Sequence, residues 1–202
     1  MGERVGLRAP EREHLDLFLR WFNNLEVLRY LQRIRPMGRA EEEEWFANLS
    51  KKSEDLVFVI VAIEGGVPIG SCGLHRISAN NRSAELGIAI GEKEYWNRGY
   101  GREAMRLLCG YGFEALNLNR IGLSVYDYNV RGIRCYERVG FRLEGRRRAA
   151  RFWEGRYWDI LEMGLLESEW RAGREPASPE KCQEGTLKDA LRLPSGQAGG
   201  NR

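Results

Sequence analysis

The sequence has few metal-binding side chains, little net charge and no long hydrophobic segment. It contains two histidines, His14 and His75, and its four cysteines do not fall in pairs at metal-ligand spacing, so we expect no metal site. No apolar run approaches the roughly 18–20 residues that a membrane span needs, and residues 1–10 lack the apolar core of a signal peptide. The formal net charge of +3 is too small to favour nucleic acid or a membrane surface as a partner. These absences predict a cytoplasmic protein, with Cys72 and Cys109 as free thiols that fill the core.

The chain of 202 residues suits one domain followed by a tail. Hydrophobic residues make up 43 % and charged residues 30 %, a balance typical of a globular protein with its own core. After Trp170 the composition shifts to Pro, Gly, Ser, Lys and Glu with few aromatic residues. We therefore expect one domain over residues 1–170 and a largely disordered tail over 171–202, in which only Thr186–Leu193 favours a helix.

Helical patterns dominate the first fifty residues. Val5–Arg8 suits a short strand, and three helical segments follow it. The first of these has apolar residues at the i, i+3, i+4, i+7 spacing of one buried helix face. We expect helices near residues 10–22, 25–31 and 40–52, with a loop over 33–39 where Pro and Gly occur.

From residue 56 the pattern changes to strands. Leu56–Ile63 is a β-branched apolar run, Val67–Leu74 follows the turn Gly65–Gly66, and the two form a predicted hairpin. Ser83–Ile90 is a third predicted strand, and helices and strands alternate after it. An antiparallel meander followed by two crossover units predicts an α/β protein with a mixed sheet and helices on both faces. The remaining expected elements are a helix over Gly99–Leu116, a strand over Ile121–Val125, a helix over Val130–Val139, and strands over Phe141–Arg148 and Arg156–Leu165.

The most distinctive local feature is the loop Trp96–Ala104, with the sequence WNRGYGREA. Gly99 and Gly101 remove side chains where a backbone approaches a ligand. The helix that follows presents free N–H groups and the positive end of its dipole, which suits a pyrophosphate. Arg98 and Arg102 add positive charge. The loop therefore indicates a phosphate site, although a plain tight turn at a helix start also explains the two glycines.

Two other phosphate loops fit this segment less well. The Walker loop requires Gly followed by Lys and then Ser or Thr, and that string does not occur. The dinucleotide loop tolerates Ala104 in place of its third glycine, but it follows the first strand of a parallel βαβ unit. Here three strands of antiparallel type come first, which argues against a dinucleotide-binding fold.

A second motif lies at Asn129–Phe141, with the sequence NVRGIRCYERVGF. Asn129 suits the N-cap of a helix, and Gly140 suits its C-terminal stop. Tyr136 lies two turns along the same helix, and Phe141 opens the next strand. A capped amphipathic helix accounts for Asn129 and Gly140 without any functional role.

The two motifs together resemble the GNAT superfamily of acetyltransferases. More narrowly, the chain resembles the branch of ribosomal-protein-alanine and spermidine N-acetyltransferases. Two further segments carry this resemblance: Ala84–Ile88 (AELGI) and the pattern G-x-Y-x-D-x-x-x-M over residues 155–163. The resemblance covers about residues 3–168. It implies a mixed, mostly antiparallel sheet of about seven strands, splayed in the middle. Trp96 departs from the Gln or Arg of many members, but this branch often has an aromatic residue there.

The resemblance also implies where acetyl-CoA, the co-substrate, binds. It would lie between two splayed parallel strands, Leu86–Ile90 and Ile121–Val125, with its pantetheine arm paired to the backbone as if it were another strand. N–H groups of the loop would hold the pyrophosphate, and Asn129 would contact the ligand while it caps its helix. The implied binding residues are Ile88, Ala89, Ile90, Arg98, Gly99, Tyr100, Gly101, Arg102 and Asn129, with no metal ion.

The implied reaction is direct acetyl transfer from the thioester to an amine. An alkyl ammonium has a pKa of roughly 10 and must lose a proton before it attacks. Glu85 matches the family's general base, although a charge on the solvent side of its strand is the simpler interpretation. Tyr136 matches the family's general acid for the departing thiolate, although it could be a core tyrosine. An N–H group near Ile88 would stabilise the oxyanion.

The sequence leaves the acceptor open. A protein N-terminus such as that of a ribosomal protein, a polyamine and an amino sugar all remain, and the alternative is a non-catalytic acetyl-CoA-binding sensor domain. The run Glu41–Glu44 could attract a polyamine, but it also suits a solvated helix face. Arg146–Arg148 and Arg151 could hold an acidic substrate, ribosomal RNA or the 3′-phosphate of CoA, or could simply protect a strand edge. A homodimer would be in keeping with the family.

Overall fold

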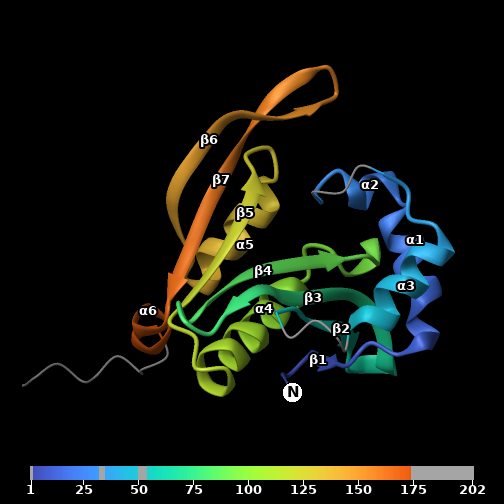
Figure 1. Cartoon of the computed structure of the whole chain (residues 1–202), viewed down its shortest axis with the longest axis horizontal. Coiled ribbons are helices and arrows are strands. Elements are labelled where there is room, and N and C mark those ends of the chain that lie inside the picture. Colours follow the sequence, from blue (N-terminus) through green and yellow to red (C-terminus); the bar gives the residue numbers. More distant parts are fainter. Residues whose placement is uncertain (1, 32–34, 50–53, 174–202) are drawn as a thin grey trace, which may run out of the picture.

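A seven-stranded sheet forms the centre of the protein, with the strand order β1-β2-β3-β4-β5-β7-β6 (Figure 1). The structure is a computed structural model that describes residues 2–31, 35–49 and 54–173. The predictions for most of the tail 171–202, for the start of the loop 33–39 and for the end of the helix 40–52 therefore lie outside the described residues. The strands are β1 (Val5–Arg8), β2 (Leu56–Ala62), β3 (Val67–Ser78), β4 (Ser83–Ile90), β5 (Arg120–Tyr126), β6 (Arg142–Trp153) and β7 (Arg156–Leu166).

Helices cover both faces of this sheet. Within the described residues, no helix is long and apolar enough to cross a membrane. The α-helices are α1 (Leu15–Phe22), α2 (Leu25–Leu28), α3 (Arg39–Leu49), α4 (Tyr100–Gly110), α5 (Val130–Val139) and α6 (Glu167–Ala172), with 3-10 turns at Arg12–His14, Glu64–Gly66 and Lys93–Tyr95 and a π-helical turn at Tyr111–Ala115.

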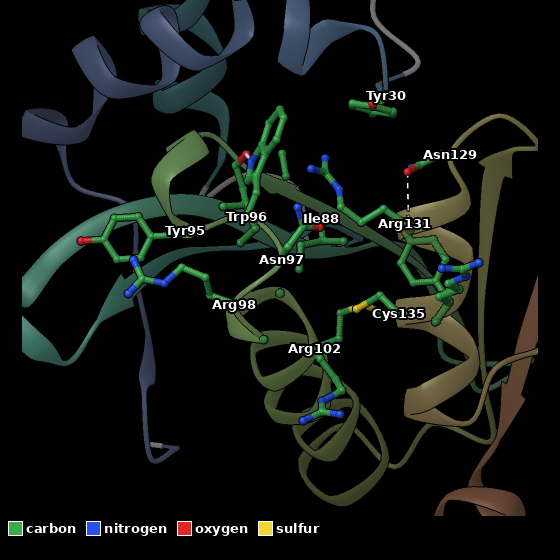
Figure 2. A pocket seen from close by; sticks show the side chains of 18 of the residues that line it. Tyr30, Ile88, Tyr95, Trp96, Asn97, Arg98, Arg102, Asn129, Arg131 and Cys135 are labelled. Atoms are coloured by element: carbon green, nitrogen blue, oxygen red, sulfur yellow. Dashed lines mark hydrogen bonds between the residues drawn. The ribbon is translucent and has the colours of Figure 1, made fainter.

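The parallel pair β4–β5 is short and then opens. These strands pair only where Ser83–Glu85 meets Arg120–Gly122, whereas every other neighbouring pair in the sheet is antiparallel. Beyond Glu85 the two strands diverge (Figure 1), and the opening between them is lined by the side chains drawn in Figure 2. The predicted mixed, mostly antiparallel and splayed sheet is therefore confirmed.

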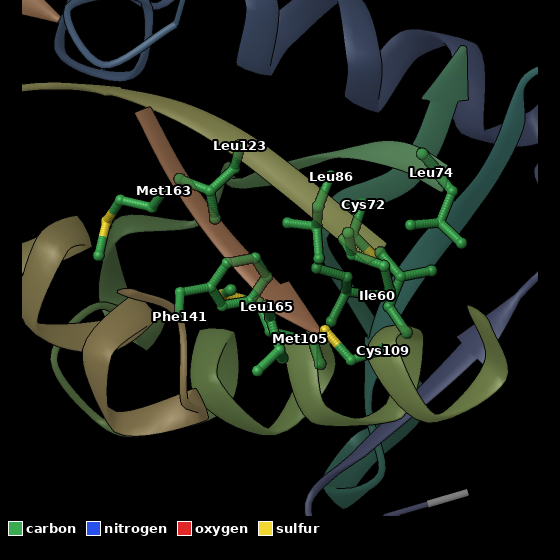
Figure 3. Packing of buried hydrophobic residues seen from close by; sticks show 14 of the residues in the cluster. Ile60, Cys72, Leu74, Leu86, Met105, Cys109, Leu123, Phe141, Met163 and Leu165 are labelled. Carbon is green, nitrogen blue, oxygen red and sulfur yellow. The ribbon is translucent and has the colours of Figure 1, made fainter. Parts of the chain in front are cut away.

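The main core lies between the sheet and α4. Ile121 and Leu123 of β5 alternate with half-exposed residues, so one face of the strand packs inward. Met105 and Cys109 of α4 meet that face in a buried cluster (Figure 3). Burial raises the pKa of the Cys72 and Cys109 thiols well above their usual range, so both stay neutral and behave as small apolar fillers, as predicted.

A smaller core holds the N-terminal helices on the opposite face. Phe18 and Trp21 of α1 pack with Val59 and Val61 of β2, which alternate with the residues that face the main core. Trp45 of α3 packs against this cluster, and its ring lies edge-on to Phe18 with 5.5 Å between centroids. The N-terminal helices are thereby fixed beside the end of β4.

Several elements differ from the sequence-based prediction, and α2 is the simplest case, since it ends at Leu28 and not at residue 31. β3 continues to Ser78 and β6 continues to Trp153, because both strands keep pairing across irregular positions with a neighbour. The predicted helix after Gly99 changes to the π-helical turn at Tyr111, where a Cβ on Gly112 would lie 2.9 Å from Ile121 Cδ1. The helix α6 was not predicted at all.

Candidate active site

A cavity of about 810 Å³ occupies the opening between β4 and β5. Its floor is the backbone and side chains of Ile88, Ala89 and Ile90, the part of β4 that has no partner on β5. The loop before α4 forms one wall, the first turns of α5 form another, and Tyr30 and Leu31, just after α2, close the end (Figure 2). The cavity therefore brings together both motifs that the sequence singled out.

The glycine loop forms the start of α4. Gly99 has a φ of +89°, a left-handed conformation that L side chains rarely adopt, and it precedes the first helical residue. Gly99 and Gly101 line the cavity together with Arg98 and Arg102, whereas the Tyr100 side chain is buried outside it. The first-turn N–H groups have no acceptor within the helix, so they can bind an anion.

The lining of this cavity is strongly cationic. None of the described residues that line it is an aspartate or a glutamate. Six guanidinium groups border a space with a helix N-terminus at one wall, which suits a ligand with several phosphate charges. The arginines are Arg4, Arg98, Arg102, Arg131, Arg134 and Arg138.

Asn129 caps α5 as predicted. Its Oδ1 accepts a hydrogen bond from the Gly132 backbone N–H at 3.0 Å. The side chain is buried and lines the cavity. A Cβ on Gly132 would lie 2.5 Å from the Asn129 amide nitrogen, so the glycine makes room for the cap. Asn129 therefore caps α5 and forms part of the cavity wall with the same side chain.

Tyr136 and Cys135 face the cavity from α5. Desolvation raises the pKa of Tyr136 well above its usual range. Cys135 raises this pKa slightly further, and Arg131 lowers it. Burial also raises the pKa of Cys135, although Arg102 and other arginines counteract this. A protonated phenol can give up a proton to a leaving group, whereas a protonated thiol is a poor nucleophile. The pair favours acid catalysis over a covalent thiol route.

Glu85 does not line the cavity that contains Tyr136. It borders a separate cavity of about 210 Å³, and its carboxylate forms an ion pair with Arg76. The cause is strand alternation, since Leu86 points into the main core while Glu85, with a 48 % exposed side chain, points to the opposite face. One strand thus separates the two predicted catalytic groups, and the base role of Glu85 stays a prediction. The smaller cavity is lined by Arg76, Ser83, Ala84, Glu85, Arg120, Gly122, Leu123, Ser124, Glu144, Glu162 and Met163.

His75 was not among the predicted site residues, and it pairs with Glu85 across β3 and β4. Its Nδ1 lies 3.2 Å from Asp55 Oδ1. Its ring lies over Gly73 and Gly87, because a Cβ on either glycine would come within 3.0–3.3 Å of His75 Nε2. The two glycines that leave room for the His75 ring are present in the sequence, but only the register of β3 against β4 shows that Gly73 and Gly87 lie opposite each other.

An aromatic cluster with Arg131 closes the end of the cavity near Tyr30, and the sequence did not predict it. The Arg131 guanidinium carbon lies 4.0 Å from the Trp96 ring centroid and 5.1 Å from that of Tyr30 (Figure 2). The Trp96 indole N–H donates to the Ile90 carbonyl at 2.8 Å. Trp96 thus fixes the loop to the end of β4, which accounts for an aromatic residue at this position.

Comparison with known proteins identifies the family. The model of the acetyltransferase (GNAT) domain matches residues 4–142. The chain belongs to the GNAT acetyltransferase family. As a GNAT acetyltransferase it is an N-acetyltransferase that uses acetyl-CoA, and it transfers the acetyl group to an amine.

Individual GNAT relatives support the same assignment. The uncharacterized N-acetyltransferase p20 of Bacillus licheniformis is 31 % identical over 172 residues, which are 83 % of this chain and 96 % of p20. The putative ribosomal N-acetyltransferase YdaF of Bacillus subtilis is 36 % identical over 101 residues, which are 50 % of this chain and 55 % of YdaF. Among solved structures, the spermidine N-acetyltransferase of Vibrio cholerae in complex with CoA and spermine superposes with a TM-score of 0.79 at 29 % identity, covering 84 % of this chain and 99 % of that one.

Proposed function

We propose that this protein transfers an acetyl group from acetyl-CoA directly to a primary amine, such as a protein N-terminus, a polyamine or another small amine. The observation that carries the proposal is the cationic cavity between β4 and β5, which has a helix N-terminus at one wall and Tyr136 at another. A non-catalytic sensor domain would need the helix N-terminus to bind acetyl-CoA, but it would not need the neutral, desolvated phenol of Tyr136 beside that site.

The donor fits this cavity through backbone and charge. N–H groups from Arg98 to Arg102 suit the pyrophosphate, because the helix dipole and the guanidinium groups attract it. β4 has no strand partner on its β5 side beyond Glu85, so backbone groups of Ile88, Ala89 and Ile90 on that side can pair with an extended ligand. Asn129 borders the same space. Acetyl-CoA, once bound, supplies the activated thioester.

Tyr136 is the proposed general acid. Its raised pKa keeps the phenol protonated at neutral pH, so that it can donate its proton to the departing thiolate. Cys135 beside it stays a thiol, which leaves direct attack by the amine as the favoured route. An N–H group of the open part of β4, near Ile88, would stabilise the developing oxyanion.

The proton of the incoming ammonium needs a base on the acceptor side. Glu85 remains the proposed base, and it lies on the sheet face opposite α4. Its ion pair with Arg76 holds the carboxylate in place but also competes for its charge. A proton would reach it through water, since β4 separates Glu85 from the donor cavity.

The test is acetyl-CoA binding followed by CoA release with a panel of amines: peptides with different N-termini, spermidine, spermine and amino sugars. We expect binding, turnover with one class of amine, and a loss of about 10²–10⁴ in kcat for Tyr136→Phe with little change in the KM for acetyl-CoA. Binding without turnover on every amine would favour the sensor domain, and absence of binding would contradict the whole proposal.

A further inference from the structure

The face of the sheet that carries Glu85 differs from a surface built for a polycation. This acceptor face consists of the residues on β3–β7 that point away from α4, among them Glu85, Ser124, Tyr126 and Glu162. Glu85 is paired with Arg76, and Glu162 accepts hydrogen bonds from Arg147 Nε and Ser124 Oγ, both at 2.7 Å.

The next carboxylate on this face is held just as firmly. Glu144 makes two parallel hydrogen bonds with Arg120, and this pairing lowers the pKa of Glu144. Recognition of a polyamine requires carboxylates that are free to pair with its several ammonium groups. In the part of the chain that the structure describes, the three carboxylates beside the smaller cavity are already neutralised by arginine.

Arg151 is the opposite case, a buried cation without an anion. Arg151 is only 7 % exposed. Within the described residues, the Nε and Nη2 atoms of its guanidinium have no hydrogen-bond partner. Arg146 and Arg147 on the same strand are both paired, with Asp159 and Glu162, each at 2.7 Å. The run of arginines on β6 therefore contains one member that the fold has set apart.

The local backbone explains how Arg151 is set apart. The register of β6 against β7 shifts between Arg147 and Arg151, and Ala149 within this bulge has a φ of +49°. Asp159 holds the bulge by accepting the Ala149 N–H at 2.9 Å. Bulges re-aim the side chains that follow them and are frequent next to active sites.

Aromatic rings define the environment of the Arg151 guanidinium. Its central carbon lies 5.0 Å from the ring centroids of both Tyr126 and Trp153. Rings beside a guanidinium stabilise its charge while they leave its N–H edge directed elsewhere. Burial raises the pKa of Tyr128 to about 12, although the charge of Arg151 and a side-chain hydrogen bond with it lower the pKa, so the neighbouring phenol stays neutral and supplies no counter-charge. A planar pair of N–H donors in such a setting suits a carboxylate.

A row of rings connects Arg151 to the donor cavity. Tyr126 lies beside Arg151 and stacks on Tyr128, with 5.2 Å between the ring centroids. The ring centroids of Tyr128 and Tyr30 are 6.4 Å apart. Tyr30 lines the donor cavity, next to Trp96. In Figure 1 the end of β5 lies between α2 and the β6–β7 hairpin, which are also joined by the ion pair of Arg29 with Glu154 at 3.1 Å. Arg151 is thus linked to the end of the donor cavity at Tyr30 through the rings of Tyr126 and Tyr128.

We propose that Arg151 binds a carboxylate of the acceptor, so that the substrate is an amine that also carries an acidic group. The inference rests on the proposed function for the amine and adds the second group by which the acceptor is held. An acidic protein N-terminus and a free amino acid share this chemistry.

The test compares acceptors that differ only in charge. The probes are a tripeptide amide with Glu at its second position, its Gln twin, free glutamate and spermidine. We expect kcat/KM to be at least about ten-fold higher for the Glu peptide than for the Gln peptide or spermidine. Preference for the peptide over free glutamate would indicate a protein N-terminus, and the reverse a small molecule. Equal or better use of the Gln peptide or spermidine would overturn the inference.

Variants assign the preference to Arg151. Arg151→Gln should raise the KM for the acidic acceptor about 10- to 100-fold, without changing the KM for acetyl-CoA. Arg148→Gln, at an exposed position of the same strand, is the matched control and should keep the preference. An unchanged preference in Arg151→Gln would contradict the proposed site.

Two stability measurements separate this site from a structural role and from the proposed function itself. Arg151→Met should melt at the same temperature as the wild type or higher, because an unpaired buried charge is costly. A large drop in the melting temperature, with the preference for the Glu peptide retained, would show that Arg151 has a structural role and would overturn the inference. The Glu peptide should raise the melting temperature of the wild type but not of Arg151→Gln. If no amine releases CoA, the proposed function fails, and this thermal shift alone decides whether Arg151 binds a carboxylate.

Discussion

At the scale of single residues, Tyr136 makes a prediction about alkaline pH. A general acid works in its protonated form, and a pKa raised above the ordinary value of about 10 keeps that form present to higher pH. We therefore expect kcat to show no fall on the alkaline side until above about pH 10. The measurement is the pH profile of kcat at saturating acetyl-CoA and amine. A descending limb near pH 8–9 that disappears in Tyr136→Phe would contradict the raised pKa, and an alkaline limb that Tyr136→Phe leaves unchanged would contradict the assigned role.

Glu85 and His75 can be separated by parallel substitutions. We expect Glu85→Gln to lower kcat by about 10²-fold or more if its carboxylate takes the proton, and the KM for acetyl-CoA to stay unchanged. Glu144→Gln is the control, since Glu144 borders the same cavity in an ion pair. Full activity in Glu85→Gln together with a loss in His75→Gln would move the base role to the imidazole that Asp55 contacts.

At the scale of elements, the start of α4 offers a matched pair of glycines. Gly99→Ala should cost about 1–2 kcal/mol of stability, because alanine must adopt a left-handed conformation there. Gly101→Ala should leave stability nearly unchanged, since its Cβ would make ordinary contact at 3.6 Å from Ile90 Cγ1. That methyl group enters the donor cavity, so the KM for acetyl-CoA should rise. Chemical unfolding and steady-state kinetics check both variants, and equal stability losses would contradict the argument.

The elements predicted best are those whose ends are marked by turn or capping residues in the sequence. β4 and α5 have the predicted bounds, because turn residues precede the strand and Asn129 and Gly140 delimit the helix. α6 was missed because six residues show too little periodicity, and β6 was predicted to end at Arg148, whereas its pairing with β7 resumes at Arg151 after a register shift that the sequence pattern does not show.

The site was predictable to the extent that it is local. The loop and the α5 motif lie together in one cavity, since each is a continuous segment that ends at the same edge of the sheet. The separation of Glu85 from Tyr136, the ring of His75 over Gly73 and Gly87, and the isolation of Arg151 all depend on pairing between distant strands. Sequence spacing alone does not contain that information.

At the scale of the whole molecule, the open part of β4 predicts how the donor affects stability. A ligand present at about 100 times its Kd stabilises a folded protein by about 2.7 kcal/mol. Acetyl-CoA should therefore raise the melting temperature and slow hydrogen exchange over residues 86–90 and 98–102, where backbone groups have no strand or helix partner on the cavity side. Exchange in β1 and β2 is the internal control. Uniform protection across the sheet would argue against a ligand bound at the opening.

The position of β4 between its two cavities also has a consequence for the order of events. The donor cavity and the cavity beside the proposed base Glu85 lie on opposite sides of this one strand, so under the proposed function neither substrate has to leave before the other enters. Both can reside on the protein at once, in a ternary complex, and no acetylated form of the protein has to exist between them. Initial velocities measured at several fixed amine concentrations should then give intersecting double-reciprocal lines, whereas parallel lines would reveal a ping-pong cycle.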